Sequence, residues 1–142
     1  TYFGMGDYEG TRREFEKIIE IDPNNVVIYS NLGELYATLK EYKKAEENFL
    51  RAIDLMPDYE FPLNNLGKMY FEQGRLGESK VVLERSLSAN RKSGRVHYFL
   101  AQIAEKEKDK KGALTHFEKA IELGLQGEEL KEAQKRLEAL KK

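Results

Sequence analysis

Hydrophobic and small residues recur along the chain at the spacing of helices that bury one face. From Val26 onward, a first set falls at intervals of three and four residues and consists of Tyr29, Leu32, Gly33 and Tyr36. A second set follows a short polar stretch and consists of Ala45, Phe49, Ala52, Ile53 and Leu55. Such spacings place residues on one side of an α-helix, so this stretch predicts two helices of about 13 residues each.

The same pattern returns every 34 residues, the interval that separates Leu32, Leu66 and Leu100. The shift needs no gap and also aligns a column of large residues, Phe15, Phe49, Leu83 and Phe117. It aligns two columns of small residues, which are Gly33, Gly67 and Ala101, and Thr11, Ala45, Ser79 and Ala113. Antiparallel helices approach within about 8 to 10 Å only where one of them presents almost no side chain. Each period is therefore predicted to be one helix pair, and successive pairs are predicted to stack.

The turn between consecutive helix pairs has its own signal. In Asp22-Pro23-Asn24-Asn25, the proline stops the preceding helix and an asparagine supplies a side-chain oxygen that caps the next one. The equivalent segment one period later, Met56-Pro57-Asp58-Tyr59, predicts the same break.

This signature resembles that of the tetratricopeptide repeat family, whose units of the same length carry a large residue, Leu-Gly, Tyr, Ala, Phe, Ala and Pro. The matching residues are Tyr29, Leu32, Gly33, Tyr36, Ala45, Phe49, Ala52 and Pro57. The resemblance implies an all-α fold, a right-handed α-α superhelix (solenoid) of antiparallel helix pairs. It predicts a single array over 1–142, with a partial repeat at 1–25, full repeats at 26–59, 60–93 and 94–127, and a C-terminal capping helix at 128–142.

The two ends of the array carry separate expectations. The last helix is expected to cap the array, because it has a charged face and an apolar face made of Leu130, Ala133, Leu137 and Leu140. At the other end, Tyr2, Phe3 and Met5 are interpreted as the end of a first helix that is mostly missing, so the parent protein is expected to continue upstream.

The composition narrows the classes of function. Of 142 residues, 40% are hydrophobic and 35% are charged, a balance typical of a folded helical protein. The 24 Lys and Arg nearly balance the 25 Asp and Glu, so there is no electrostatic reason to expect nucleic acid or an anionic membrane as partner. The absence of Cys excludes disulfides and thiolate chemistry. No signal peptide is predicted within these residues and no run approaches the roughly 18 apolar residues of a membrane span, so the compartment stays open.

In arrays of this kind the first helix of each pair lines the concave side, so residues around the glycine column predict the binding surface. We expect a groove for a protein or peptide partner, lined by Asn31, Glu34, Phe61, Asn64, Asn65, Lys68, Phe71, Arg95, Tyr98, Phe99 and Gln102. Exposed aromatic side chains in a concave patch are typical of binding anchors. The alternative for each ring is packing between repeats.

Asn31 and Asn65 occupy the same repeat column. An amide both donates and accepts hydrogen bonds, so amides repeated along a groove can bind the backbone of an extended peptide. The column resembles the asparagine ladder of O-linked N-acetylglucosamine transferases, although Phe99 breaks it. The alternative is that these amides simply tolerate a polar surface. Ser30 and Glu34 depart from the carboxylate clamp of chaperone-binding members, so an acidic chaperone C-terminus is not expected as partner.

Catalysis finds little support. The two histidines, His97 and His116, lie 19 residues apart rather than at the i, i+4 spacing of a helical metal site, so packing or surface roles are expected. No catalytic residue, metal ligand or cofactor is predicted. Two other functions stay open: an assembly element that self-associates through its ends or convex face, and a substrate-docking arm of a larger enzyme.

Overall fold

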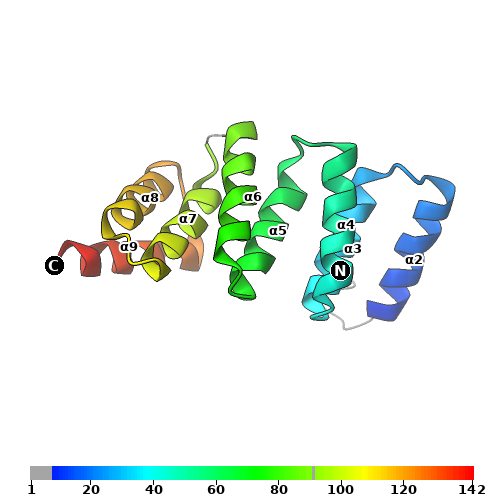
Figure 1. Cartoon of the computed structure of the whole chain (residues 1–142), viewed down its shortest axis with the longest axis horizontal. Helices are drawn as coiled ribbons and strands as arrows, with labels where there is room; N and C mark the ends of the chain where they lie inside the picture. Colours follow the sequence, from blue (N-terminus) through cyan, green and yellow to red (C-terminus); the bar gives the residue numbers. More distant parts are fainter. Residues whose placement is uncertain (1–7, 91) are drawn as a thin grey trace. The chain divides into compact units, whose positions relative to one another are not determined.

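The computed structural model describes residues 8–90 and 92–142. Figure 1 shows their helices in chain order. They are α2 (Tyr8–Ile21), α3 (Val26–Thr38), α4 (Tyr42–Leu55), α5 (Glu60–Glu72), α6 (Leu76–Ala89), α7 (Gly94–Lys106), α8 (Lys110–Glu122) and α9 (Gly127–Lys141). The predicted all-α fold is confirmed, and the described residues contain no strand. Tyr2, Phe3 and Met5, assigned to a first helix by the sequence, lie outside the described residues.

The helices fall in pairs at the predicted period. The segment 26–59 contains α3 and α4, the segment 60–93 contains α5 and α6, and the segment 94–127 contains α7 and α8. The last helix, α9, begins at Gly127, one residue before the segment expected to cap the array.

The chain forms two compact units, Thr1–Met69 and Tyr70–Lys142, and the division between them lies inside α5. In the first unit, α3 packs along α4, and α2 contacts α3. In the second unit, α7 packs along α8, α6 contacts α7, and α9 contacts α8. The α3/α4 and α7/α8 pairs are tight helical hairpins, as Figure 1 shows for each unit.

Close approach of α3 and α4 depends on the small residues that the repeat pattern singled out. Phe49 and Ala45 of α4 are fully buried. A Cβ atom added at Gly33 of α3 would lie 2.6 Å from the Phe49 ring, well inside van der Waals contact. The glycine column therefore makes room for an aromatic ring of the neighbouring helix, as the sequence predicted.

The core of the second unit draws residues from α7, α8 and α9. Ala101 of α7, Ala113 and Phe117 of α8, and Ala133 of α9 are all fully buried. Three partly buried leucines of α9 pack against the same cluster, namely Leu130, Leu137 and Leu140. The last helix thus covers apolar residues of the α7/α8 hairpin with one face.

Side-chain oxygens begin two of the first helices. The Ile28 N–H donates to Asn25 Oδ1 at 3.1 Å at the start of α3, which confirms the predicted asparagine cap. At the start of α7, the Val96 N–H donates to Ser93 Oγ at 3.3 Å. Such caps contribute about 1 kcal/mol each, because they satisfy an amide that has no partner within the helix.

A left-handed residue recurs in the turn within each helix pair. Lys40, Gly74 and Lys108 lie one period apart and have φ angles of 62°, 80° and 63°. This conformation costs an L-residue about 1 to 2 kcal/mol, whereas glycine adopts it freely. At Lys40 and Lys108 the turn therefore keeps its left-handed conformation although lysine adopts it less readily than glycine.

Glycine substitutions test this turn. We expect Lys40→Gly to raise the free energy of unfolding by up to about 1 kcal/mol, since the relieved strain exceeds the added entropy of the unfolded chain. Gly74→Ala should lower the same quantity by about 1 kcal/mol. Equilibrium unfolding in urea, followed by circular dichroism, measures both variants. Destabilisation by Lys40→Gly together with no effect of Gly74→Ala would contradict the left-handed turn.

Candidate functional site

Two apolar side chains remain accessible on the first helices of the first unit. Val27 and Phe61 lie one period apart, in the first turns of α3 and α5, and are 51% and 57% exposed. The Phe61 ring also touches the Tyr59 ring edge-on, with centroids 5.4 Å apart. One side of Phe61 is therefore fixed by a neighbour, while much of its surface faces solvent.

The predicted amides follow these apolar residues on the same helix faces. Residues at i, i+4 and i+7 share one side of a helix. On α3 this face carries Val27, Asn31 and Glu34, and we call these residues the α3 stripe. On α5 it carries Phe61, Asn65 and Lys68, the α5 stripe. In each stripe the amide is half-buried and the charged residue is exposed, so the order of chemistry is the same: apolar, amide, charged.

Asn64 is the remaining predicted residue of the first unit. It precedes Asn65 and therefore lies about 100° around the helix from the α5 stripe. Its side chain is half-buried, and the residue takes part in an interaction within the protein. Asn64 therefore flanks the α5 stripe and is not one of its members.

Two predicted anchors of the second unit are buried, not exposed. Tyr98 and Phe99 of α7 are only 7% and 8% exposed. The Phe99 ring lies 6.3 Å from the Phe71 ring of α5, and the Tyr98 ring lies 6.2 Å from the Phe117 ring of α8. The expectation of exposed rings at Tyr98 and Phe99 is corrected, because both rings contribute to the core of this unit; Phe71 is half-buried.

Charged groups of α9 also reach the predicted face of α7. Arg95 Nε lies 3.4 Å from Glu129 Oε1, and Arg136 Nη1 donates to Glu105 Oε1 at 3.2 Å. Burial raises the pKa of Tyr98, and the nearby Glu129 carboxylate adds to the effect. Arg95 already has a carboxylate partner within the chain, so it is a poor receptor for an acidic ligand.

Gln102 is the last predicted residue of this face, and its side chain is half-buried on α7. It lies one helical turn from the buried Tyr98 and Phe99. Among the predicted residues of the second unit, the polar groups of Gln102 and Arg95 are the most accessible to solvent. Arg95 already pairs with Glu129.

The sequence interpretation missed a contact between the two histidines. His97 of α7 and His116 of α8 meet across the hairpin, with their Nδ1 atoms 3.0 Å apart. Burial lowers the pKa of both imidazoles; the His116 ring and the Lys119 ammonium lower that of His97 further. For His116, the carboxylates of Glu84 and Asp109 oppose the effect of burial. The signal that was missed is the separation of 19 residues. Within one repeat, residues that far apart occupy facing positions on the first and second helix.

Within the described residues, 8–90 and 92–142, no helix has the length and apolar character that crossing a membrane requires. The same ranges contain no group of three or more His, Cys, Asp or Glu side chains arranged to hold a metal ion.

Comparison with known sequences gives matches along most of the chain. Family models described as Tetratricopeptide repeat match residues 1–25, 26–92 and 64–128. Among curated proteins, anaphase-promoting complex subunit 3 of Schizosaccharomyces pombe is 28% identical over 116 residues. That alignment covers 82% of this chain but only 17% of the relative. The chain thus spans a small part of the length of the relative it matches.

Comparison with solved structures gives similar folds. A structure described as the functional characterization of Pseudomonas aeruginosa PilF has a TM-score of 0.80 at 26% identity, over 87% of this chain and 56% of that one. The structure of YrrB, described as a TPR protein with an unusual peptide-binding site, has a TM-score of 0.72 at 25% identity. The YrrB match covers 78% of this chain and 57% of the other.

Proposed function

This chain belongs to the tetratricopeptide repeat family, and from that premise we propose that it binds an extended segment of a partner protein along the first helices of its repeats. Members of the family generally act as non-enzymatic modules of protein–protein interaction. Because one scaffold serves many partners, the binding surface has to be argued from the residues themselves.

The observation that carries the proposal is the repeated order of the α3 and α5 stripes. Each begins with an exposed apolar residue, Val27 or Phe61, continues with a half-buried amide, and ends with a charged residue. Accessible apolar side chains beside polar groups are typical of interaction surfaces. Since the stripes repeat with the period of the array, they suit a ligand that presents similar groups at regular intervals.

The amides define what kind of ligand the stripes would take. Asn31 and Asn65 each offer two N–H donors and one carbonyl acceptor, which match the C=O and N–H groups of an extended peptide. Such contacts do not depend on the side chains of the peptide. Val27 and Phe61 would then select apolar side chains on the ligand, and Glu34 and Lys68 would add a preference for charge.

The likeness to YrrB supports the class of ligand, because that protein is described as having a peptide-binding site. The S. pombe relative does not identify the partner, because the chain covers only 17% of its length. A test therefore has to start from peptides selected on the chain itself.

The test uses peptides of about twelve residues selected by display on the purified chain. We expect Asn31→Ala/Asn65→Ala to weaken binding of the selected peptides by about 1 to 3 kcal/mol, or roughly 5- to 150-fold in Kd, since each amide bond contributes about 0.5 to 1.5 kcal/mol. Phe61→Ala should weaken them as well. Fluorescence anisotropy of labelled peptides measures the affinities, and N-methylation of the peptide backbone should reproduce the loss.

The control pair is Asn24→Ala/Asn48→Ala, which removes two amides of the first unit outside the α3 and α5 stripes. Asn24 is exposed in the turn before α3, and Asn48 lies half-buried on α4. Unchanged affinity in the Asn31/Asn65 variant, with helicity preserved by circular dichroism, would refute the proposed surface. Mass measured in solution at several concentrations separates peptide binding from self-association.

A further inference from the structure

The two histidines of the chain face each other in the second unit. Their Nδ1 atoms are 3.0 Å apart, and their ring centroids are 5.2 Å apart with a tilt of 32° between the rings. His97 is 8% exposed and His116 is half-buried. At this distance the two imidazoles either share one proton or direct two nitrogen lone pairs toward a common ligand.

The positions of the pair within the repeat indicate that packing alone does not require histidine. One period earlier, the same two positions hold Leu63 and Val82, and two periods earlier they hold Tyr29 and Asn48. Burying two imidazole rings removes their nitrogen atoms from water, which costs free energy that an apolar pair of side chains would not lose. A residue that is less favourable for packing than an apolar side chain is expected where that residue serves a function.

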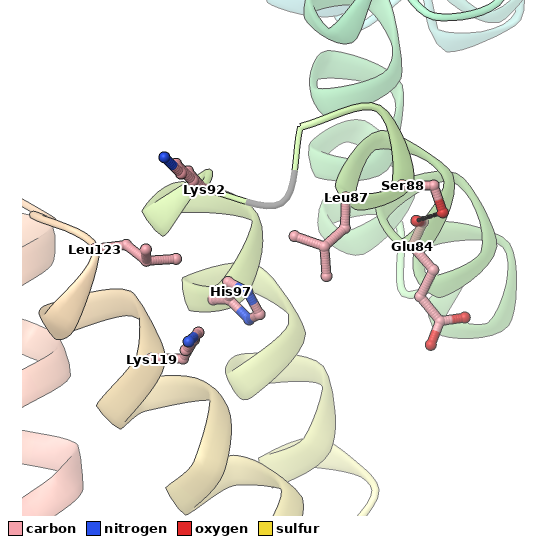
Figure 2. Close-up of a pocket in the computed structure, with 7 residues that line it drawn as sticks. All are labelled: Glu84, Leu87, Ser88, Lys92, His97, Lys119 and Leu123. Atoms are coloured by element: carbon pink, nitrogen blue, oxygen red, sulfur yellow. Dashed lines mark hydrogen bonds between the residues drawn. The ribbon is translucent and has the colours of Figure 1, made fainter.

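A pocket of about 530 Å³ lies beside His97 and is lined by residues of α6, α7 and α8, together with Lys92 and Leu123. Figure 2 shows the His97 ring facing the middle of this pocket, between Leu87 of α6 and Leu123, the residue that follows α8. Glu84 of α6 also lines the pocket. The pocket therefore gives water access to the His97 ring, whereas His116 is not among the residues that line it and Lys119 is.

We propose that His97 and His116 form a two-histidine site for a divalent transition metal ion of the zinc, nickel or copper class, completed by water from the adjacent pocket. Neutral imidazole is a common ligand for these ions, with metal–nitrogen distances of about 2.0 to 2.1 Å. Two nitrogens held 3.0 Å apart would then subtend about 90° at the ion, a cis arrangement. The ion lies off the line between the nitrogens, so binding requires a small rotation of both rings.

The bound ion would connect α7 to α8, and so would favour the folded form of the hairpin. A ligand that binds only the folded state raises the free energy of unfolding, and the gain grows with the logarithm of ligand concentration above Kd. The site has two protein ligands, in keeping with the lack of any larger cluster of ligating side chains in the described residues.

The composition makes the experiment specific, because the chain has two His and no Cys. Zn²⁺ is titrated calorimetrically into the untagged, chelator-treated chain at pH 7.5. We expect one equivalent to bind, His97→Leu and His116→Val each to weaken binding at least tenfold, and the double variant to abolish it. With Cu²⁺, electron paramagnetic resonance should show two nitrogen ligands in the natural chain and one in each single variant.

The matched control is Tyr29→Leu/Asn48→Val, which makes the same replacements at the equivalent positions of the first unit. It should leave Zn²⁺ binding unchanged. If the apolar histidine variants lose helicity, His97→Gln and His116→Gln repeat the test with polar side chains. Zn²⁺ binding that survives the double variant would place the ion on surface carboxylates and overturn the proposal. Absence of binding at millimolar Zn²⁺ would overturn it too, since the pair then only shares a proton.

Discussion

Replacing Phe117 by alanine should lower the free energy of unfolding by about 3 to 5 kcal/mol, the largest loss expected at any single position discussed for this chain. Phe117 is fully buried on α8, and the Tyr98 ring lies against it at 6.2 Å between centroids. The substitution removes apolar area and leaves a cavity that rigid helices close only in part. Urea unfolding, followed by helicity at 222 nm, measures the loss.

Phe61→Ala is the matched control for Phe117→Ala, because it removes the same atoms from a side chain that is 57% exposed. Its effect on stability should stay within about 0.5 kcal/mol, as for most surface substitutions. Its effect on peptide affinity should be larger than its effect on stability. Equal destabilisation by the two phenylalanine substitutions would mean that Phe61 is a packing residue and would remove it from the α5 stripe.

Gly33→Ala should destabilise the α3/α4 hairpin by about 1 to 3 kcal/mol, although alanine favours helix more than glycine does. The added Cβ would stand 2.6 Å from the Phe49 ring, and Phe49 is fully buried and cannot withdraw. The two helices would have to separate or the ring would have to leave its rotamer. Thermal and urea unfolding both report this cost.

Gly77→Ala provides the comparison for Gly33→Ala, because a Cβ at Gly77 of α6 meets nothing within 4 Å. Here the helix preference of alanine acts alone, so stability should rise by up to about 1 kcal/mol. A double variant, Gly33→Ala/Phe49→Leu, should show coupling, with Gly33→Ala costing less when the ring is absent. A stabilising Gly33→Ala, or strict additivity with Phe49→Leu, would show that the close helix contact is absent.

The sequence predicted the elements of the fold well because the responsible interactions are local and repeated. Spacings of three and four residues located the helices, and the small residue at Gly33 predicted the close contact with α4. The Asn25 cap was predictable because it links residues three positions apart. These features depend on neighbours in sequence, or on neighbours one helix away within the same repeat.

The parts of the candidate site that the sequence misjudged depend on more distant neighbours. Tyr98 and Phe99 occupy columns that are polar in other repeats, yet both are buried by contacts with α5 and α8. No periodic pattern specifies which rings fill those spaces. The contact between His97 and His116 likewise requires knowing which faces of α7 and α8 meet, and spacing along one helix gives no indication of this.

The last helix of the second unit has a practical consequence for handling the protein. Its apolar face lies against the core of the α7/α8 hairpin, and two ion pairs, Arg95–Glu129 and Arg136–Glu105, attach its rim. Both pairs are partly solvated, so added salt weakens them, whereas the leucine contacts persist. Ending a recombinant version before Gly127 would expose the apolar residues of the α7/α8 hairpin that α9 covers, and we expect such a version to aggregate.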